Sequence, residues 1–307
     1  MEHDSKNCRR VKVTVGLFHI AVLLSVFGCS PVKISVNSSQ STAPTDTSHA
    51  VDDKPPVTIY RQQIRDIAGG SSCAQTNWAD RGRSPGGYIK GMALSFARSL
   101  CRIRIAEPPH PASSILKSVN SLDATKDVLA HYQDILTDIG IAASVTGQQP
   151  LQATYTIGLG LGMMESSGKY CEGWDIAAGA DRESYEAEAG LFQASYDSAN
   201  TSNELQKLYD EYYKNPKRCL LETYKEAVVC RPANILGAGA GATFQEFTKR
   251  CPAFATEYAM ALIRIRRTHF GPLNRRTAQV VPECNVMLNA VRQVVNQNPE
   301  LACRELF

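Results

Sequence analysis

Apolar residues recur at helical spacing along most of the chain after its N-terminal region. They stand three or four positions apart, which is the period of one face of an α-helix. One of the segments is apolar nearly all round, which predicts a helix buried on every side. The helices predicted by this pattern span residues 88–103, 121–139, 151–164, 205–213 and 220–229.

Two further helices are predicted from proline positions. Pro252 and Pro282 each stand where the first turn of a helix tolerates proline, with apolar residues following at helical spacing. Gly271-Pro272 is expected to end the helix that begins at Pro252, and the last helix is expected to reach about Val295.

Alternating polar and apolar runs, which would predict strands, are scarce. We therefore expect a mainly α fold with at most a small β-hairpin, placed between Tyr170 and Leu191. Residues 58–150 are expected to form a helical N-terminal part of the domain, and residues 151–307 its remaining part. No internal repeat is found.

The N-terminus has the pattern of an export signal. A basic patch precedes residues 13–27, which are mostly apolar and shorter than the about 20 residues that a membrane-spanning helix needs. Residues 29–57 are mostly Ser, Thr, Asp and Pro and predict a disordered tether. Residues 1–28 are therefore expected to be a signal peptide.

The end of this signal, Val26-Phe27-Gly28-Cys29-Ser30, resembles the lipobox of bacterial lipoproteins. The resemblance implies cleavage before Cys29 and a lipid on its sulfur, which would attach the protein to a membrane. Ser30 after the cysteine implies the outer membrane, on the periplasmic side of the cell envelope. The alternative is an ordinary signal or an uncleaved anchor with an incidental cysteine.

Composition limits the function classes. Hydrophobic residues make up 43% of the 307 residues and charged residues 21%, so the chain can bury a core. A net charge of +3 argues against nucleic acid as a partner, since such proteins carry a dense basic surface.

Ten cysteines indicate an oxidising compartment. Cys8 lies in the basic leader and Cys29 is the lipidation candidate, which leaves an even number for disulfides. These eight are Cys73, Cys101, Cys171, Cys219, Cys230, Cys251, Cys284 and Cys303. The sequence does not choose among their many possible pairings. No CxxC and no close Cys/His pair occurs, so no metal and no cofactor are expected.

The glycine-rich run at residues 158–162 does not match a nucleotide-binding loop. It lacks the third glycine of the dinucleotide fingerprint and the Gly-Lys-Ser/Thr of a phosphate loop. The glycines instead indicate close packing of the buried helix. The chain also has no GxSxG and no HExxH motif.

The candidate catalytic residue is Glu165, at the end of the apolar helix predicted over residues 151–164. Partial burial and the negative end of the helix dipole both favour its protonated form. A carboxylic acid that stays protonated near neutral pH can donate a proton to the leaving oxygen of a glycosidic bond. Gly168 suits the left-handed residue that ends such a helix.

Glu165-Ser-Ser-Gly168 followed by Gly190-Leu-Phe-Gln193 resembles the lytic transglycosylases and goose-type lysozymes of the lysozyme-like superfamily. The resemblance covers about residues 157–197 and extends less clearly to Phe270. It implies a lysozyme-like helical domain that acts on peptidoglycan.

The resemblance also implies roles for individual residues. Glu165 would be the catalytic acid/base, with Ser166 and Ser167 as neighbours that fix it or touch the sugar. The segment Gly190, Leu191, Phe192 and Gln193 would line the sugar groove, with Gln193 contacting substrate. Tyr258 is the candidate for a tyrosine that this family often hydrogen-bonds to the catalytic glutamate.

Acidic residues between the two motifs leave the reaction open. An inverting hydrolase would need one of them as a base, and Asp175 and Glu188 are the two candidates. A transglycosylase needs no second carboxylate, because the 6-hydroxyl of the sugar attacks and leaves a 1,6-anhydro end. Arginines from residue 264 to residue 276 either meet acidic wall polymer or form a solvated helix face.

The sequence thus predicts an exported enzyme that cleaves the β-1,4 bond between N-acetylmuramic acid and N-acetylglucosamine, with peptidoglycan glycan strands as its partner. Lytic transglycosylase chemistry is preferred over hydrolysis. One alternative is a lipoprotein that binds the wall without cleaving it. The other is a hydrolase of a different amino-sugar polymer, such as chitin.

Overall fold

The structure is a computed structural model of the chain. Every described residue belongs to one compact unit, Lys54–Phe307. The described residues are 59–104, 110–141, 147–176, 181–231 and 234–307. The predicted signal peptide, the tether and Cys29 lie outside them. Among the described residues, no helix is long and apolar enough to cross a membrane.

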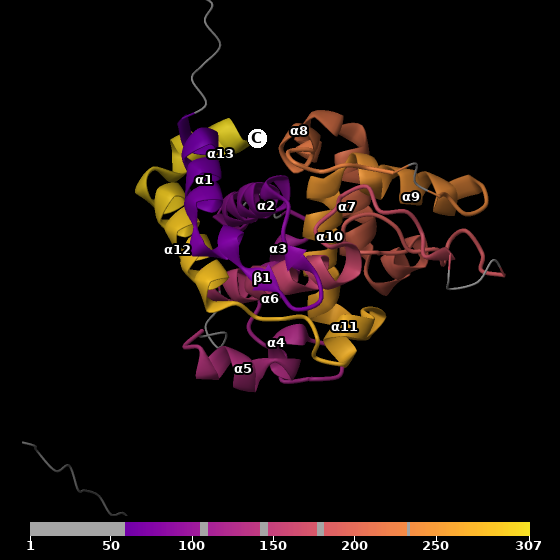
Figure 1. Cartoon of the computed structure of the whole chain (residues 1–307), viewed down its shortest axis with the longest axis horizontal. Helices are drawn as coiled ribbons and strands as arrows, with labels where there is room; N and C mark the ends of the chain where they lie inside the picture. Colours follow the sequence, from indigo (N-terminus) through magenta and orange to yellow (C-terminus); the bar gives the residue numbers. More distant parts are fainter. Residues whose placement is uncertain (1–58, 105–109, 142–146, 177–180, 232–233) are drawn as a thin grey trace, which may run out of the picture. The chain divides into compact units, whose positions relative to one another are not determined.

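The mainly helical fold is confirmed (Figure 1). Its α-helices are α1 (Ile59–Gly70), α2 (Gly86–Arg104), α3 (Ser113–Lys117), α4 (Val128–His131), α5 (Gln133–Asp138), α6 (Gln148–Ser166), α7 (Asn203–Lys214), α8 (Leu221–Tyr224), α9 (Gly239–Arg250), α10 (Pro252–Ile265), α11 (Gly271–Asn274), α12 (Pro282–Gln297) and α13 (Pro299–Leu306). Its 3₁₀ helices are η1 (Ser72–Gln75), η3 (Tyr196–Thr201), η4 (Pro216–Cys219) and η5 (Arg267–His269).

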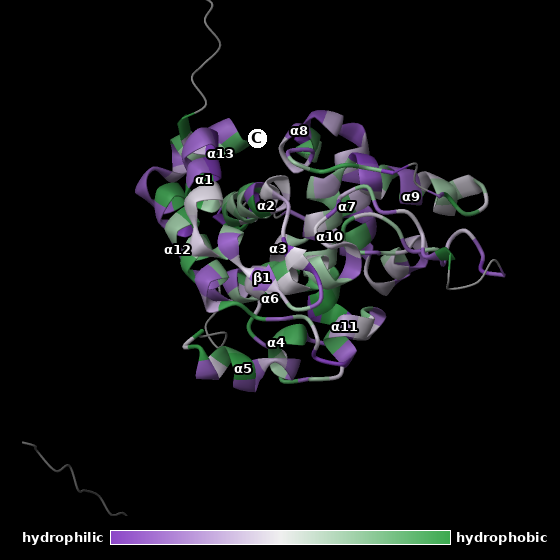
Figure 2. Ribbon diagram, in the orientation of Figure 1, coloured by the Kyte–Doolittle hydropathy of each residue, from purple (hydrophilic) through white to green (hydrophobic). Residues whose placement is uncertain are grey.

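Four long helices, α2, α6, α10 and α12, form what we call the helical frame. Helix α6 packs against the other three, and α2 contacts all of them as well (Figure 1). Almost all residues of α6 are buried, as its all-round apolar sequence predicts. Hydrophilic and hydrophobic residues alternate around the peripheral helices α12 and α13, as expected of helices with one exposed side (Figure 2).

Glycines allow α6 to lie against its neighbours, and the predicted close packing is confirmed. A methyl group on Gly160 would overlap the carbonyl oxygen of Gln279, and one on Gly162 would overlap the hydroxyl of Tyr88. That hydroxyl donates a hydrogen bond of 2.6 Å to the carbonyl of Leu159. The absence of a side chain therefore sets how closely α2 and the 279 region approach α6.

The prediction of one helix over residues 121–139 is wrong. Ser121 does not cap a helix; its backbone N–H instead donates to the side chain of Asp127, 3.0 Å away. Asp127 is the cap, because it accepts from Leu129 N and begins α4. Buried Arg264 is paired with Asp127 at 2.8 Å, so that arginine is not on a solvated face. This buried ion pair fixes where the helix can begin.

Two other boundaries differ from prediction. The segment 220–229 is helical only over α8, and Leu220, which precedes it, has a left-handed backbone with φ 54°. Helix α10 ends at Ile265, before Gly271-Pro272, and Pro272 instead lies in the first turn of α11. In both cases the sequence pattern predicts a longer helix, but the backbone leaves the helical conformation before the predicted end.

The hairpin exists, but its predicted place is wrong. Strands β1 (Asn77–Trp78) and β2 (Gly82–Arg83) form an antiparallel pair around a turn with left-handed residues at Asp80 and Gly82. In the described part of residues 170–191 no paired strands form, and Ala189 makes only an isolated bridge with Ala194. That segment is held by a disulfide and by scattered backbone hydrogen bonds instead of a ladder.

All eight predicted cysteines are paired, so the expected four disulfides are confirmed. The pairs are Cys73–Cys284, Cys101–Cys303, Cys171–Cys230 and Cys219–Cys251. The first two join residues 211 and 202 positions apart and link the beginning of the described domain to its end.

Candidate active site

A cleft of about 580 Å³ opens beside the end of α6. Its wall brings together residues from three separate parts of the chain. The lining residues are Glu165, Lys169, Cys171, Glu172, Gly173, Trp174, Asp175, Ile176, Glu188, Gln193, Val229, Arg231 and Asn234. Four carboxylates face two cations, with an aromatic ring and two aliphatic side chains at the edge. Such a mixture suits a ligand with many hydroxyls and an apolar ring face.

Glu165 reaches this cleft because α6 ends there. Ser167 takes the left-handed conformation with φ 53°, and Gly168 follows with φ 73°. Their backbone N–H groups donate to the carbonyls of Met163 and Gly162 at 2.9 and 3.1 Å. Glu165 therefore lies in the last turn of a helix whose body is locked in the frame, so its position is set by rigid structure.

The environment of Glu165 favours the protonated carboxyl. Burial against the frame raises its pKa to about 8, and the nearby charge of Glu188 acts in the same direction. Arg275 and Arg81 partly oppose this effect. Because the free side chain titrates at 4.5, Glu165 keeps its proton at neutral pH and can donate it.

Ser166 joins the two motifs singled out in the sequence. Its buried hydroxyl contacts the carbonyl of Gly162 at 3.1 Å and that of Leu191 at 2.8 Å, tying α6 to the 190–193 segment. Gly190 has φ 80° and packs against Thr248, where a side chain would not fit. Ser166 thus positions the segment beside Glu165 and does not face the cleft.

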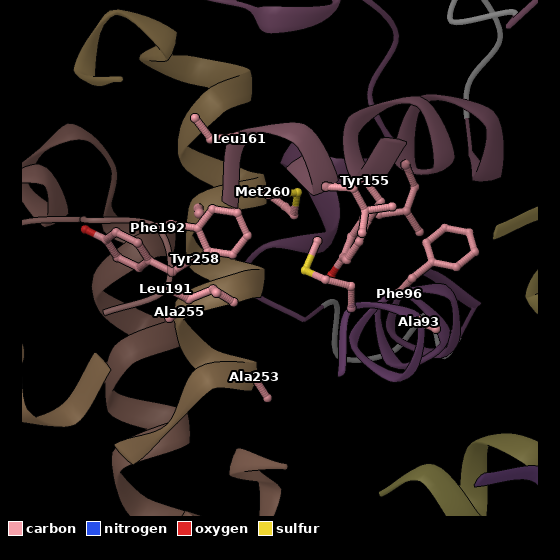
Figure 3. Close-up of a cluster of buried hydrophobic side chains, with 14 of the residues drawn as sticks. Ala93, Phe96, Tyr155, Leu161, Leu191, Phe192, Ala253, Ala255, Tyr258 and Met260 are labelled. Carbon is pink, nitrogen blue, oxygen red and sulfur yellow. The ribbon is translucent and has the colours of Figure 1, made fainter. Parts of the chain in front are cut away.

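Only one side chain of the 190–193 segment lines the cleft. Gln193 does so in a left-handed conformation, and its amide donates to the carbonyl of Gly190 at 2.9 Å. Leu191 and Phe192 lie in the core near Tyr258 (Figure 3). The hydroxyl of Tyr258 pairs with Ser198 at 2.7 Å. The structure places these three side chains behind the cleft as its support.

Both candidates for a second carboxylate line the cleft. Burial raises the pKa of Glu188 to about 7, Arg182 opposes this, and Asp197 and Asp175 add to it. Asp175 stands at the cleft wall with an exposed side chain. With Glu165 and Glu172, the cleft therefore gathers four acids, one at the end of α6 and three from the segment between the two motifs.

The loop side of the cleft is braced at two points. The disulfide Cys171–Cys230 joins its two lining segments, and the N–H of Trp174 donates to the carbonyl of Asn234 at 3.4 Å. Behind them, the buried amide of Gln245 bonds to both the backbone of Leu236 and the carbonyl of Ser184. We call this part, the described residues of 169–197 and 229–238, the loop wall.

Sequence reasoning missed several residues of the site. Trp174, Arg231 and Asn234 line the cleft, yet none of them belongs to a recognisable motif. The signal that could have found them is the cysteine pairing, because Cys171–Cys230 places these two segments together. His269, to which the sequence assigns no role, lies next to Glu188.

Comparison with family models, with curated proteins and with solved structures finds no match for the chain. Within the part of the chain that the structure describes, no group of three or more His, Cys, Asp or Glu residues is arranged to hold a metal ion.

Proposed function

We propose that this protein cleaves the β-1,4 glycosidic bond between N-acetylmuramic acid and N-acetylglucosamine in peptidoglycan, as a lytic transglycosylase. The observation that carries the proposal is Glu165, a carboxyl held by the rigid end of α6 in the wall of a polar cleft and protonated at neutral pH. Glycosidic cleavage needs an acid of this kind at the leaving oxygen.

In the proposed reaction, Glu165 donates its proton to the bridging oxygen as the bond from the sugar carbon breaks. The 6-hydroxyl of the same sugar then attacks that carbon, and its proton passes to the Glu165 carboxylate. The acid is regenerated and the product carries a 1,6-anhydro end. Trp174 and Gln193 lie where a sugar ring and its polar groups would contact the cleft.

An inverting hydrolase is the second candidate, favoured by the presence of Asp175 and Glu188 in the same cleft. In that reaction one of them would activate a water molecule. The same geometry would also serve a different amino-sugar polymer such as chitin. A wall-binding protein without turnover remains the non-enzymatic alternative, although pure binding gives no reason for a protonated glutamic acid.

Digestion of purified peptidoglycan followed by mass analysis tests these alternatives. Transglycosylation gives ends one water lighter than hydrolysis does, and the binding-only alternative gives no new ends. Glu165→Gln keeps the shape of the side chain but has no proton to transfer. General acid catalysis contributes typically about 10²–10⁴-fold, so cleavage should fall by at least about that factor.

The matched control is Glu183→Gln, because Glu183 is exposed and does not line the cleft. It should cleave at the wild-type rate. Asp175→Asn and Glu188→Gln separate the two chemistries, since a transglycosylase should tolerate at least one of these substitutions and an inverting hydrolase should lose activity with whichever residue is the base. A folded Glu165→Gln variant that cleaves as fast as the wild type would rule out the proposed mechanism.

We further propose that the protein is exported and lipid-anchored through Cys29. Four disulfides support export, because such bridges persist in oxidising compartments. Intact-mass measurement of the mature protein tests this directly. The expected N-terminus is Cys29 carrying lipid, and an unmodified Cys29 or a retained Met1 would contradict the proposal.

A further inference from the structure

His269 is a buried histidine next to the cleft. It ends the short helix η5, and its side chain is only 7% exposed. Its ring packs edge-on against Phe270, with the ring centroids 4.7 Å apart. Its Nε2 atom has no hydrogen-bond partner among the described residues. A buried polar atom without a partner is costly, so its retention calls for a role.

The unpartnered nitrogen faces a carboxyl of the cleft. Nε2 of His269 lies 3.7 Å from Oε1 of Glu188. This is longer than a hydrogen bond, but the Glu188 side chain is 36% exposed and has room to rotate. Hydrogen bonds in empty active sites are often long and shorten when ligand binds.

The partner of the other ring nitrogen, Nδ1, determines whether Nε2 acts as a hydrogen-bond donor or acceptor. The backbone of Gln193 lies beside the imidazole and raises the pKa of His269, which is the effect of a carbonyl that accepts from a ring N–H. We therefore assign the ring proton to Nδ1, which donates to Gln193. Nε2 then carries a lone pair and can only accept. The group able to donate to it is the protonated carboxyl of Glu188.

We propose that His269 is a positioning residue that accepts a hydrogen bond from the protonated carboxyl of Glu188 through Nε2. The bond holds Glu188 in its neutral form, with one oxygen turned to the ring and the other left to accept a hydrogen bond from a ligand. The ring is itself aligned by Gln193, which also lines the cleft, so both sides of the imidazole are tied to the site.

The surrounding charges are consistent with a proton on Glu188. Burial lowers the pKa of His269 to about 4, Arg266 lowers it further, and Asp197 raises it. The pKa of Glu188 is raised to about 7 by burial, with Asp197 and Asp175 adding to it and Arg182 opposing it. Between pH 4 and pH 7 the proton therefore lies on the carboxyl and the ring is neutral.

The pair bears on the proposed reaction, and this step rests on the proposed function. Below about pH 7, where Glu188 is mainly protonated, it cannot take a proton from water and so cannot serve as the base of an inverting hydrolase. A neutral Glu188 does not raise the pKa of Glu165, so burial, the larger cause, keeps Glu165 protonated while Glu188 is protonated. The arrangement therefore favours attack by the 6-hydroxyl of the sugar, which yields anhydro ends.

Nuclear magnetic resonance titration of the full mature protein tests the proposal without depending on catalysis. With ¹³C in glutamate carboxyls and ¹⁵N in histidine rings, Glu188→Gln identifies the signal of Glu188. The wild type should show an unprotonated Nε2 and a protonated Nδ1 at His269 at pH 6. It should also show Glu188 still half protonated near pH 7.

Two variants of His269 separate the hydrogen bond from simple packing. His269→Asn keeps a donor for Gln193 but loses the acceptor for Glu188, so the pKa of Glu188 should fall by roughly 0.5–1 pH unit. His269→Gln brings an amide oxygen toward the Nε2 position and should restore most of that shift. His131→Asn, a substitution at a histidine bonded to Leu273, should leave Glu188 unchanged.

Several outcomes would overturn the proposal. These are a protonated Nε2 in the wild type, a doubly protonated ring at pH 6, or an unchanged pKa of Glu188 in a folded His269→Asn variant. The wild-type measurement needs no variant, so a variant that fails to fold leaves the test intact. If the proposed function fails, the wild type does not cleave peptidoglycan, yet the titration still decides whether His269 holds Glu188.

Discussion

The helical frame and the loop wall hold the two sides of the cleft by different means. The frame is a set of long, buried helices packed through glycines, and two disulfides close it over more than 200 residues of chain. The described residues of the loop wall form no long helix, and the wall meets the core through Leu191 and Phe192. One disulfide, one buried glutamine and a few backbone bonds hold the rest of it. Glu165 belongs to the frame, while Asp175 and Glu188 belong to the wall.

This difference indicates which groups of the site need a fixed position. The acid must keep its proton and its place, so it is attached to the least deformable part of the domain. The wall carries groups that touch the ligand, and such groups gain from the freedom to adjust. We expect the stability of the domain to depend mainly on the frame, and local adaptability to be confined to the wall.

A large effect on global stability should come from the frame disulfide Cys73–Cys284. Because Cys101–Cys303 stays closed, the loop closed by this bridge comprises about 47 residues, 28 between positions 73 and 101 and 19 between positions 284 and 303, and corresponds to about 4 kcal/mol in the chain-entropy relation. The double variant Cys73→Ser, Cys284→Ser should therefore lose about that much free energy of unfolding. Denaturant unfolding measures it, and a loss below about 1 kcal/mol would contradict the importance given to this bridge.

Loss of the wall disulfide Cys171–Cys230 should act mainly on the local stability of the loop wall. Its loop of 59 residues corresponds to about 4 kcal/mol. In Cys171→Ser, Cys230→Ser the wall can open while the frame stays folded, so proteases should cut between residues 171 and 197 under native conditions. Mapping the cut sites by mass tests this, with the frame variant as the control. Cut sites spread evenly along the chain would show that the frame and the wall do not differ in local stability.

Packing within the frame should respond to a single methyl group. Gly160→Ala sets a carbon against the carbonyl of Gln279 and should cost about 1–3 kcal/mol, because the backbone there has little room to move. Gly86→Ala is the matched control. No atom lies near its added methyl group, and it should be neutral or slightly stabilising. The melting temperatures of the two variants are compared. Equal values would show that the frame accommodates the added methyl group of Gly160→Ala without losing stability.

Another test concerns the pH dependence of stability that Glu165 contributes. Its pKa is raised to about 8 in the folded protein and is ordinary in the unfolded chain, so the unfolded chain releases this proton first. The stability that its neutral form contributes is present at low pH and is lost as the pH rises from about 4.5 through 8. Glu165→Gln removes this dependence.

Melting temperatures of the wild type and Glu165→Gln, compared from pH 5 to pH 9, measure this effect. The stability of the variant relative to the wild type should increase across that range and level off above about pH 8. Glu183→Gln, at an exposed residue outside the cleft, is the matched control for the substitution itself. A constant difference between wild type and Glu165→Gln would mean that Glu165 is not desolvated.

Helices whose own apolar pattern decides their packing were predictable. Helices α2, α6, α10 and α12 each carry enough apolar residues at helical spacing that burial in almost any arrangement would stabilise them. The short helices α4 and α8 failed as predictions. Their boundaries depend on long-range features, such as the ion pair of Asp127 with Arg264, which lie far from the segment itself.

Some residues of the candidate site could likewise be predicted from the sequence, and others could not. Glu165, Asp175, Glu188 and Gln193 were found from short motifs and from acids between them, and all four line one cleft. The placement of Leu191 and Phe192 in the core could not be foreseen, because the local sequence does not say which face of a loop turns inward. His269 could not be found either, because it lies 81 positions from Glu188 and no motif links them.

The sequence by itself determined the helical class of the domain, the even set of cysteines, and the acid at the end of a buried helix. Each of these follows from local periodicity, residue counts or the dipole of one helix. Only the tertiary structure decided the disulfide pairing, the position of the hairpin, and the meeting of His269, Glu188 and Glu165. These depend on contacts between distant segments, which the packing of the whole domain selects and no short stretch of sequence encodes.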